Sequence, residues 1–235
     1  MTLKVMGAEA EYGSVRVGKT AHAEGNACQG NGLSSHAEGT QTIADGVSGH
    51  AEGGYSTAVA QYSHAGGSYS RSDGYASWSR ASAHPSLLDA SRAQHASYPL
   101  GCSLPTGAAA GPMTFNSSQT LIYSPSGTQN VLIVPYRGSY LCTLTFSGRR
   151  WPLLNGTGFG ACYQALFVRD SGLRQVGSTI TLATFSDPGI TGWAVTFGVD
   201  VSNFAVTITL SNANSGTYGI HAVGRLDVTE LVGTS

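Results

Sequence analysis

The residues best suited to chemistry in this sequence are histidines and glutamates that recur in the phrase His-Ala-Glu-Gly. Four histidines stand 14 residues apart, and a glutamate follows each of the first three at the second position. The set consists of His22, Glu24, His36, Glu38, His50, Glu52 and His64. Imidazole and carboxylate groups serve in general acid–base catalysis and also bind metal ions. Residues two apart on a β-strand share one face, so each pair is expected to lie together.

The repetition favours a structural role for these side chains. Catalysis needs an acid–base pair in a cleft with a nucleophile, and no copy of the phrase is distinguished from the others. A metal ion could bind if three chains brought their histidines to a common axis. Hydrogen bonds between His and Glu, made between coils or between chains, account for every copy at once. The histidines would also separate glutamates that repel one another. We therefore predict structural, interchain residues, with no catalytic residue, no metal and no cofactor.

Small residues follow the same 14-residue register. With each histidine as position 1, positions 2, 4 and 14 hold small residues in successive copies, and positions 7, 9 and 11 repeat the pattern. Alternation of small and variable residues is typical of a strand with two different faces. Glycine at positions 4 and 11 indicates tight turns, because it tolerates a positive φ. Each unit is therefore predicted to be two short strands joined by two tight turns.

Such units, stacked in register, form a parallel β-roll. Residues 15–97 would give about six coils and a stack of roughly 30 Å at the usual strand spacing. Its narrow interior of Ala, Ser and Gly buries little apolar area. At about 25 cal/mol per Å², this burial does not offset about 1–2 kcal/mol of backbone entropy per residue. The outer faces are therefore expected to gain burial against other copies of the chain.

Tandem 14-residue units with small-x-Ala-x-Gly half-repeats resemble the head repeats of trimeric autotransporter adhesins. That family forms a left-handed parallel β-roll from three chains side by side. The variant SHAEG…AxG…SHAEG is similar to repeats in bacteriophage tail-fibre and appendage proteins, and the resemblance covers residues 15–97. The membrane anchor and coiled-coil stalk of the adhesins have no counterpart in this sequence. The resemblance therefore implies a homotrimer of the phage type rather than a cell-surface adhesin.

The overall composition excludes several classes of protein. Charged residues make up 11% of the 235 residues and the formal net charge is −1, so no basic footprint for nucleic acid is present. No run of 18 apolar residues predicts membrane insertion, and the first residues lack the apolar core of a secretory signal. Four cysteines without metal-type spacing predict free thiols in a protein made in a cytoplasm. They are Cys28, Cys102, Cys142 and Cys162.

The composition changes near residue 100, from Gly, Ala, Ser and His to Leu, Ile, Val, Phe and Thr. We predict a linker over residues 98–112, where Pro and Gly are frequent, and an antiparallel, jelly-roll-like β-sandwich over residues 113–235. Period-two segments separated by turn-forming clusters predict eight strands. They span about 114–123, 131–136, 139–146, 161–169, 174–185, 192–199, 203–210 and 217–231. The fold class is therefore all-β.

The C-terminal half offers binding residues rather than catalytic ones. Its glycine-rich GTGFG precedes a strand instead of a helix, and no pair of carboxylates stands out as in a glycosidase. Aromatic side chains in loops bind sugars and proteins, and Arg149-Arg150-Trp151 suits a loop tip. The predicted receptor-binding residues are Arg149, Arg150, Trp151, Phe159 and Trp193. The ending from YLCTLTFSGRR through DVTEL also resembles the C-terminal domains of phage tail fibres, which implies a trimeric, receptor-binding tip.

Together these features predict a non-enzymatic, homotrimeric phage tail fibre, located on the virion and made in the host cytoplasm. The roll would act as a spacer, and the sandwich would bind a glycan or protein of the host surface. Residues 1–14 precede the repeat register, and Glu9, Glu11 and Tyr12 are the candidates for attachment to tail or baseplate proteins. A head fibre or capsid decoration protein is the alternative. A tailspike depolymerase and a cell-surface adhesin fit the sequence less well.

Overall fold

The computed structural model describes residues 13–83, 92–117, 131–134, 137–151, 158–188 and 190–232. All regular structure within these ranges is β, and none of it is a helix that could span a membrane. The chain divides into two compact units, which we call the repeat unit, up to Ala96, and the C-terminal unit, from Ser97. The predicted attachment residues Glu9, Glu11 and Tyr12 lie outside the described residues.

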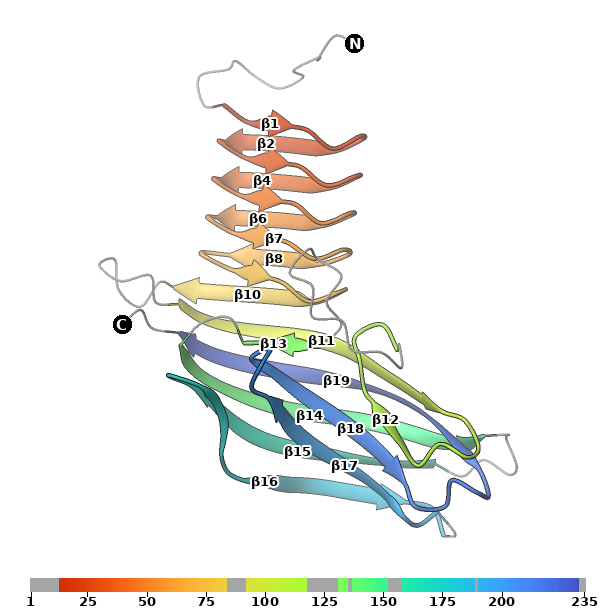
Figure 1. Ribbon diagram of the computed structural model, residues 1–235. Helices are drawn as coiled ribbons and strands as arrows, with labels where there is room; N and C mark the ends of the chain where they lie inside the picture. Colours follow the sequence, from red (N-terminus) through yellow and green to blue (C-terminus); the bar gives the residue numbers. More distant parts are fainter. Residues whose placement is uncertain are drawn as a thin grey trace. The chain divides into compact units, whose positions relative to one another are not determined.

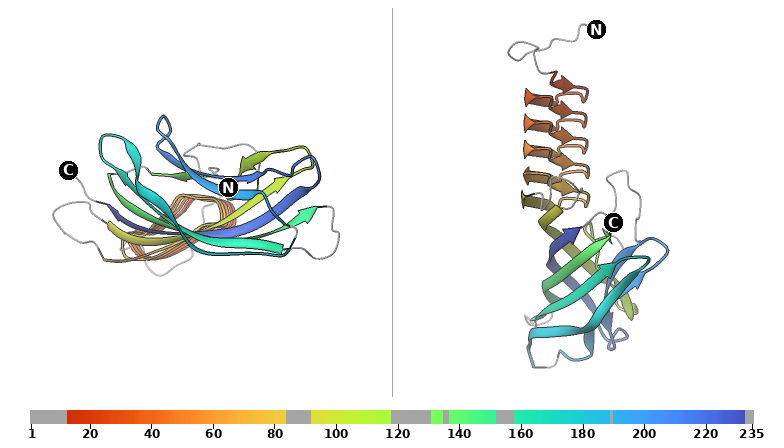
Figure 2. Two further views of the ribbon diagram at one scale, coloured as in Figure 1. Left: turned by 90° about the horizontal axis from the view of Figure 1, so that it is seen from below. Right: turned by 90° about the vertical axis from the view of Figure 1, so that its left-hand side faces the viewer.

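The repeat unit is a parallel β-solenoid (Figures 1 and 2). Its longer strands form one sheet: β2 (His22–Asn26), β4 (His36–Thr40), β6 (His50–Gly54), β8 (His64–Gly67) and β10 (Trp78–Ala83). Two-residue strands form a second sheet: β1 (Val15–Arg16), β3 (Gln29–Gly30), β5 (Ile43–Ala44), β7 (Thr57–Ala58) and β9 (Arg71–Ser72). Successive strands pair 14 residues apart, as His22 does with His36. The predicted roll of 14-residue coils is confirmed.

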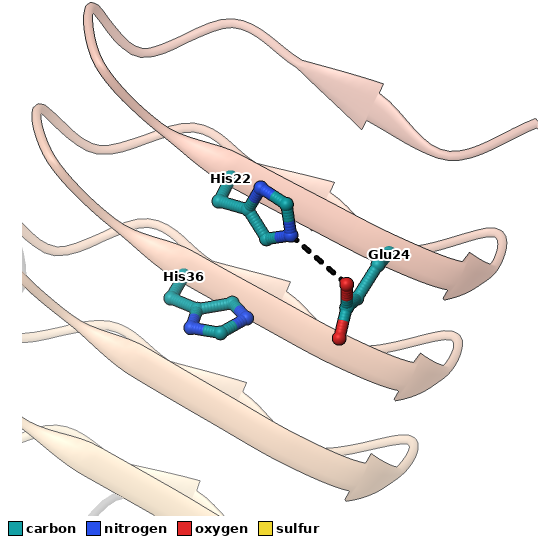
Figure 3. Close-up of side chains that lie close together, drawn as sticks. All are labelled: His22, Glu24 and His36. Atoms are coloured by element: carbon teal, nitrogen blue, oxygen red, sulfur yellow. Dashed lines mark hydrogen bonds and ion pairs between the residues drawn. The ribbon is translucent and has the colours of Figure 1, made fainter. Parts of the chain in front are cut away.

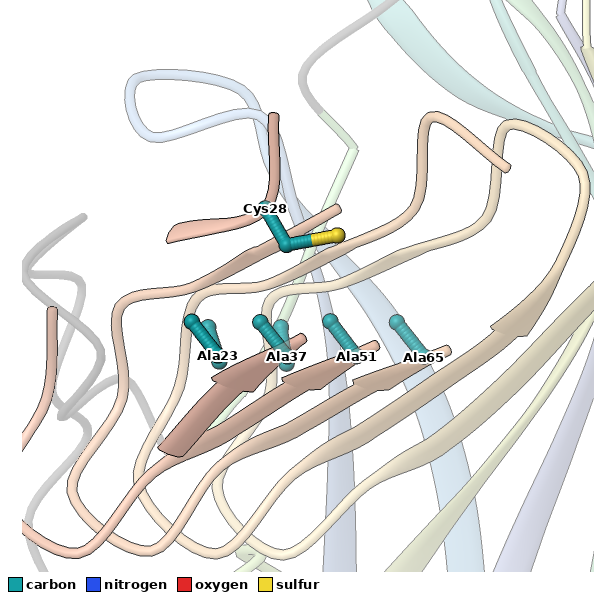
Figure 4. Packing of buried hydrophobic residues seen from close by; sticks show 7 residues of the cluster. Ala23, Cys28, Ala37, Ala51 and Ala65 are labelled. Atoms are coloured by element: carbon teal, nitrogen blue, oxygen red, sulfur yellow. The ribbon is translucent and has the colours of Figure 1, made fainter. Parts of the chain in front are cut away.

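The interior of the solenoid is built from the smallest side chains (Figure 4). The longer strands contribute one alanine each, and the shorter strands and turns face them with Cys or Ala. This cluster consists of Ala23, Cys28, Ala37, Ala44, Ala51, Ala58 and Ala65. The two layers approach closely, because a β-carbon on Gly30 would lie 2.8 Å from the carbonyl oxygen of His22. Larger side chains therefore have to point outward.

Glycine at position 4 meets two separate demands. The four glycines there have φ angles between 90° and 110°, a region that side chains rarely adopt. A β-carbon on Gly39 would also lie 2.1 Å from the carbonyl oxygen of Gly53 in the next coil. The prediction of positive φ at position 11 is wrong, because none of the described glycines there has one. At that position glycine is favoured by close approach instead: a β-carbon on Gly32 would lie 2.1 Å from the carbonyl oxygen of Gly46, although Ala60 occupies the same position one coil after Gly46.

Most residues with a positive φ in each coil are not glycines. The repeat pattern did not predict them. Positions 6 and 13, seven residues apart, have φ angles between 51° and 61°. They are Thr20, Ala27, Ser34, Gln41, Ser48, Tyr55, Tyr62, Tyr69 and Ala76. Each costs roughly 1–2 kcal/mol in an isolated chain. Hydrogen bonds between coils hold them, since the amide of Tyr55 donates to the carbonyl of Thr40 at 2.8 Å and that of Tyr62 to Val47 at 2.9 Å.

The C-terminal unit consists of two antiparallel sheets. One has the order β16 (Leu173–Ser186), β15 (Gly158–Arg169), β14 (Gly138–Trp151), β19 (Gly219–Val232) and β11 (Arg92–Leu104). In the other, β18 (Ala205–Asn212) pairs along its length with β17 (Trp193–Asp200). Its other edge pairs with β12 (Ala110–Pro112) and β13 (Leu132–Ile133). Side chains between the sheets, such as Phe167 and Phe197 with ring centroids 5.9 Å apart, form the core.

The antiparallel sheets follow the prediction closely from residue 138 onward, where six strands occupy the expected segments. Residues 98–112, predicted as a linker, instead contain the end of β11 and all of β12. Every second residue of this part of β11 is buried, and the Tyr98 ring stacks on that of Phe115 with centroids 4.7 Å apart. Burial of alternate side chains therefore favours a strand here, even though the segment contains prolines and glycines that are typical of a linker. The strand expected at 114–123 is reduced to a bridge at Thr114 within its described part.

All four cysteines are free, as predicted from their spacing. Cys28, Cys102 and Cys142 are buried and Cys162 is partly exposed. Burial raises the pKa of the Cys142 thiol far above its ordinary value, so this thiol stays protonated. Cys28, Cys102 and Cys142 therefore act as small core residues.

Alanine at Gly53 is expected to destabilise the repeat unit by about 2 kcal/mol or more. The new β-carbon would lie 2.1 Å from the carbonyl oxygen of Gly67, on a backbone with a φ of 90°. Gly54→Ala is the matched control, because a β-carbon at that neighbouring position has no atom within 4 Å. Thermal unfolding followed by circular dichroism should show a lower midpoint for Gly53→Ala alone. Equal midpoints would contradict the close approach of the coils.

Candidate functional site

The histidines and glutamates of the repeats form one continuous face of the repeat unit, which we call the His–Glu face. Strand pairing places each histidine directly beside the next one, and each glutamate likewise. The rings form a row with centroids 4.9, 4.8 and 4.6 Å apart from His22 to His64, and Trp78 continues it at 5.2 Å. The 14-residue register therefore converts a sequence repeat into a ladder of imidazoles beside a ladder of carboxylates.

The carboxylates connect histidines both within a coil and between coils. His22 Nε2 lies 3.0 Å from a carboxylate oxygen of Glu24 in the same strand (Figure 3). Glu38 lies between two histidines, with one oxygen 3.7 Å from His36 Nε2 and the other 3.6 Å from His50 Nε2. The last contact of the row, at 3.3 Å, joins Glu52 to His64 of the next coil. The face is thus a network within a single chain, and the interchain role stays a prediction.

Charge is distributed unevenly over the His–Glu face. The hydrogen bond from His22 holds the pKa of the Glu24 carboxyl below its usual value, with smaller attraction from the His22 and His36 rings. Three carboxylates line an open groove of about 520 Å³, together with the glycines at position 4. The Nε2 atoms of His36 and His50 are shielded from solvent and have no hydrogen-bond partner. The face therefore combines stacked carboxylates with two nitrogen atoms that lie near Glu38 without a hydrogen bond.

The substitution His22→Gln is expected to raise the pKa of the Glu24 carboxyl toward its ordinary value. The folded pKa is lowered, so the interaction stabilises the repeat unit at neutral pH and is lost as the pH falls through the folded pKa, below 4.5. Carboxyl carbon shifts in an NMR titration measure this pKa directly. The change should occur in His22→Gln and be absent in His221→Gln, a histidine of the C-terminal unit. A Glu24 pKa that is the same in both variants would contradict the hydrogen bond.

The predicted receptor-binding residues gather at one end of the C-terminal unit, which we call the aromatic end. Register places Arg149 opposite both Gly158 and His221, so β14 ends where β15 and β19 begin. Phe159 pairs with Ser186, and a short turn leads from there to Trp193 at the start of β17. Residues that lie far apart in the sequence therefore meet where several strands begin or end.

The aromatic rings at this end form a packed cluster. The Trp193 ring lies 4.9 Å from that of Phe159 and 5.7 Å from that of Phe146, measured between centroids. Tyr163 stacks on Phe146 at 6.3 Å. Trp193 is partly exposed, but Phe159 is only 1% exposed. Phe159 therefore supports Trp193 from within the core, and its predicted direct contact with a receptor is corrected.

The two arginines at the aromatic end differ in their surroundings. Arg149 is exposed, whereas the guanidinium of Arg150 lies 4.2 Å above the ring of Tyr218. The Tyr218 hydroxyl donates to the carbonyl of Thr191 at 3.1 Å, and Asn214 donates to the same carbonyl. This network fixes Arg150 beside the ring of Tyr218. The backbone of Trp151 ends β14, and its side chain lies outside the described part of the chain.

No protein-family model matches the chain, and no curated protein matches its sequence. One solved structure that is similar is the crystal structure of a tailspike protein from Acinetobacter baumannii bacteriophage Fri1, a capsular polysaccharide depolymerase. The two share 14% sequence identity at a TM-score of 0.27, over 63% of this chain and 20% of that chain. This chain thus spans about a fifth of that protein's length. At this level of similarity the match says nothing about the activity of the present chain.

Proposed function

We propose that the chain is a non-enzymatic bacteriophage fibre protein that assembles as a homotrimer. The repeat unit is the spacer, and the aromatic end of the C-terminal unit binds a glycan or protein on the host surface. Glu9, Glu11 and Tyr12 belong to the segment that attaches the fibre to other virion proteins. The observation that carries this proposal is the distribution of apolar side chains in the repeat unit. The smallest ones lie inside the solenoid, and the largest ones are exposed on its outer surface.

The outward apolar residues of the repeat unit support assembly with further copies. Six large ones are between 44% and 69% exposed, namely Val15, Val17, Leu33, Tyr55, Tyr62 and Trp78. The Tyr55 and Tyr69 rings stack at 4.7 Å with an interplanar angle of 2°, so part of this surface is already ordered for packing. Exposed apolar side chains on successive coils are typical of an interaction surface. Copies of the same chain that pack side by side would bury them.

The C-terminal unit carries a second surface of this kind on β16. This 14-residue strand is the last in its sheet, and almost all its side chains are exposed. Ile180, Leu182 and Phe185 are 57%, 54% and 60% exposed. A long apolar strand at a sheet edge pairs readily with another chain. Association of copies through both units would hold the three aromatic ends together.

The aromatic end has the chemistry of a binding surface. A partly exposed indole stacks on sugar rings, and exposed guanidinium groups bind carboxylates or sulfates of a glycan. Trp193 is partly exposed and Arg149 is exposed at this end, and the Tyr218 network fixes the neighbouring Arg150. A single site of this size binds weakly. Three copies on one fibre would strengthen it through multivalency.

The purified chain is expected to have a solution mass of about 73 kDa, three times the 24.2 kDa of one chain. Light scattering coupled to gel filtration measures this mass. The trimer should persist in EDTA, because the apolar contacts invoked here need no metal ion. A monomer would refute the assembly on which the proposed function depends.

Arg149→Ala and Trp193→Ala are expected to weaken binding to bacterial cells or glycans at least tenfold, which corresponds to about 1.4 kcal/mol. Fluorescently labelled trimer, applied to a glycan array and to host cells, measures the loss. Leu231→Ala is the matched control, because Leu231 is also exposed, at 57%, but pairs with Ser139 at the opposite end of the sheet. A trimer that binds no host surface at all would favour the head-fibre alternative.

A further inference from the structure

Two groups of side chains on the His–Glu face bring three potential metal ligands together. His22, Glu24 and His36 form one group, and their ligand atoms all lie within 4.8 Å of one another (Figure 3). Glu38, His50 and Glu52 form the other at the same spacing. Both groups come from adjacent strands of one chain, so neither depends on the meeting of three chains at an axis.

The distances are close to those that a metal ion requires. Zinc binds imidazole nitrogen and carboxylate oxygen at about 2.0–2.2 Å, so two ligand atoms of a tetrahedral site lie roughly 3.4 Å apart. His22 Nε2 and the Glu24 oxygen are 3.0 Å apart. The remaining ligand atom belongs to His36, whose side chain is 39% exposed and lies on the outer face. To bind an ion, the ligand atoms would have to close from separations of up to 4.8 Å to about 3.4 Å.

The surroundings favour a cation for two independent reasons. Glu24, Glu38 and Glu52 stack in register and line one groove, and stacked like charges destabilise a sheet unless a positive charge lies between them. In addition, the Nε2 atoms of His36 and His50 are shielded from solvent and make no hydrogen bond, and the Glu38 carboxylate lies 3.7 and 3.6 Å from them. A shielded polar atom without a hydrogen bond is uncommon and costs free energy. A metal ion would satisfy both the carboxylates and these nitrogens.

The mixture of ligands indicates which metals fit. Imidazole nitrogen suits Zn²⁺, Ni²⁺, Co²⁺ and Cu²⁺, whereas Mg²⁺ and Ca²⁺ prefer oxygen ligands alone. Two histidines with one glutamate leave one position of a tetrahedral ion for water. The group with one histidine and two glutamates is harder in character and binds the same ions less tightly.

We propose that the His–Glu face binds transition-metal dications, with the tighter site formed by His22, Glu24 and His36 and a weaker one by Glu38, His50 and Glu52. Each site lies within one chain. The proposal therefore does not rest on the fibre function, and bound metal would reinforce the contacts between coils without being required for the trimer.

Calorimetric titration of the full chain, first stripped with EDTA and then dialysed, tests the proposal with ZnCl₂ as the probe. We expect saturable binding with one tight site per chain and a second, weaker one, and no such binding of MgCl₂. The double variant His22→Gln/His36→Gln should lose the tight site, with an affinity at least tenfold lower. Glu24→Gln should weaken it while leaving the weaker site unchanged. His95→Gln/His221→Gln removes two other histidines and should bind as the unaltered chain does.

Cobalt provides a readout that depends on geometry rather than on folding. Co²⁺ bound in a tetrahedral site absorbs strongly in the visible range, and the unaltered chain should show this band where His22→Gln/His36→Gln does not. Circular dichroism of each variant establishes that its coils are intact. The proposal is overturned if Zn²⁺ binds equally to the double variant and its control, if binding does not saturate, or if no heat and no cobalt band are observed. Light scattering on the same samples tests the fibre function separately.

Discussion

The approach of one coil's backbone to the next is the constraint on which the repeat unit depends. A β-carbon at Gly39 would lie 2.1 Å from a carbonyl oxygen of the following coil, and the same distance recurs at Gly25, Gly53 and Gly67. Such contacts leave no freedom to slip by one residue, because slippage would place a side chain against backbone. The register of 14 residues is thus fixed by the backbone itself. Every outward side chain then lies directly above its counterpart in the next coil.

Because the coils stack in register, outward side chains of one type lie above one another in columns. This arrangement stabilises some columns and destabilises others. Aromatic columns gain ring packing, as the imidazoles of His36 and His50 do with an interplanar angle of 4°. Carboxylate columns accumulate like charge. Histidine stands two residues before glutamate, so the column of imidazoles lies beside the column of carboxylates. Glu38 thereby contacts the imidazoles of both His36 and His50. The network follows from a single repeated phrase, and it persists up to Gly66, where the glutamate is missing.

Sequence periodicity predicted most of the strands of this fold. It did not predict the contacts between residues that lie far apart in the sequence. The 14-residue register gave the coils and their small interior, and alternation gave the six long strands after residue 138. Left-handed tyrosines such as Tyr55 carry no sequence signal, because hydrogen bonds between coils hold them. The placement of Arg149 beside Gly158 depends on register between strands, and the burial of Phe159 depends on which face of the sheet its side chain occupies. Aromatic type alone could not distinguish a buried ring such as Phe159 from a partly exposed ring such as Trp193.

The two units use aromatic residues in opposite ways, and the difference follows from the size of their interiors. The sandwich has room for Phe146, Phe159 and Phe167 between its sheets, so its stability grows with apolar burial at about 25 cal/mol per Å². The described interior of the solenoid holds only small residues such as Ala, Ser, Thr, Cys and Gly, so adding coils lengthens it without enlarging its core. The stability of the solenoid therefore comes from contacts between coils, and Tyr62 and Trp78 remain exposed on the outside of the single chain. In the proposed homotrimer these side chains would be covered, so assembly would stabilise every coil that takes part in it.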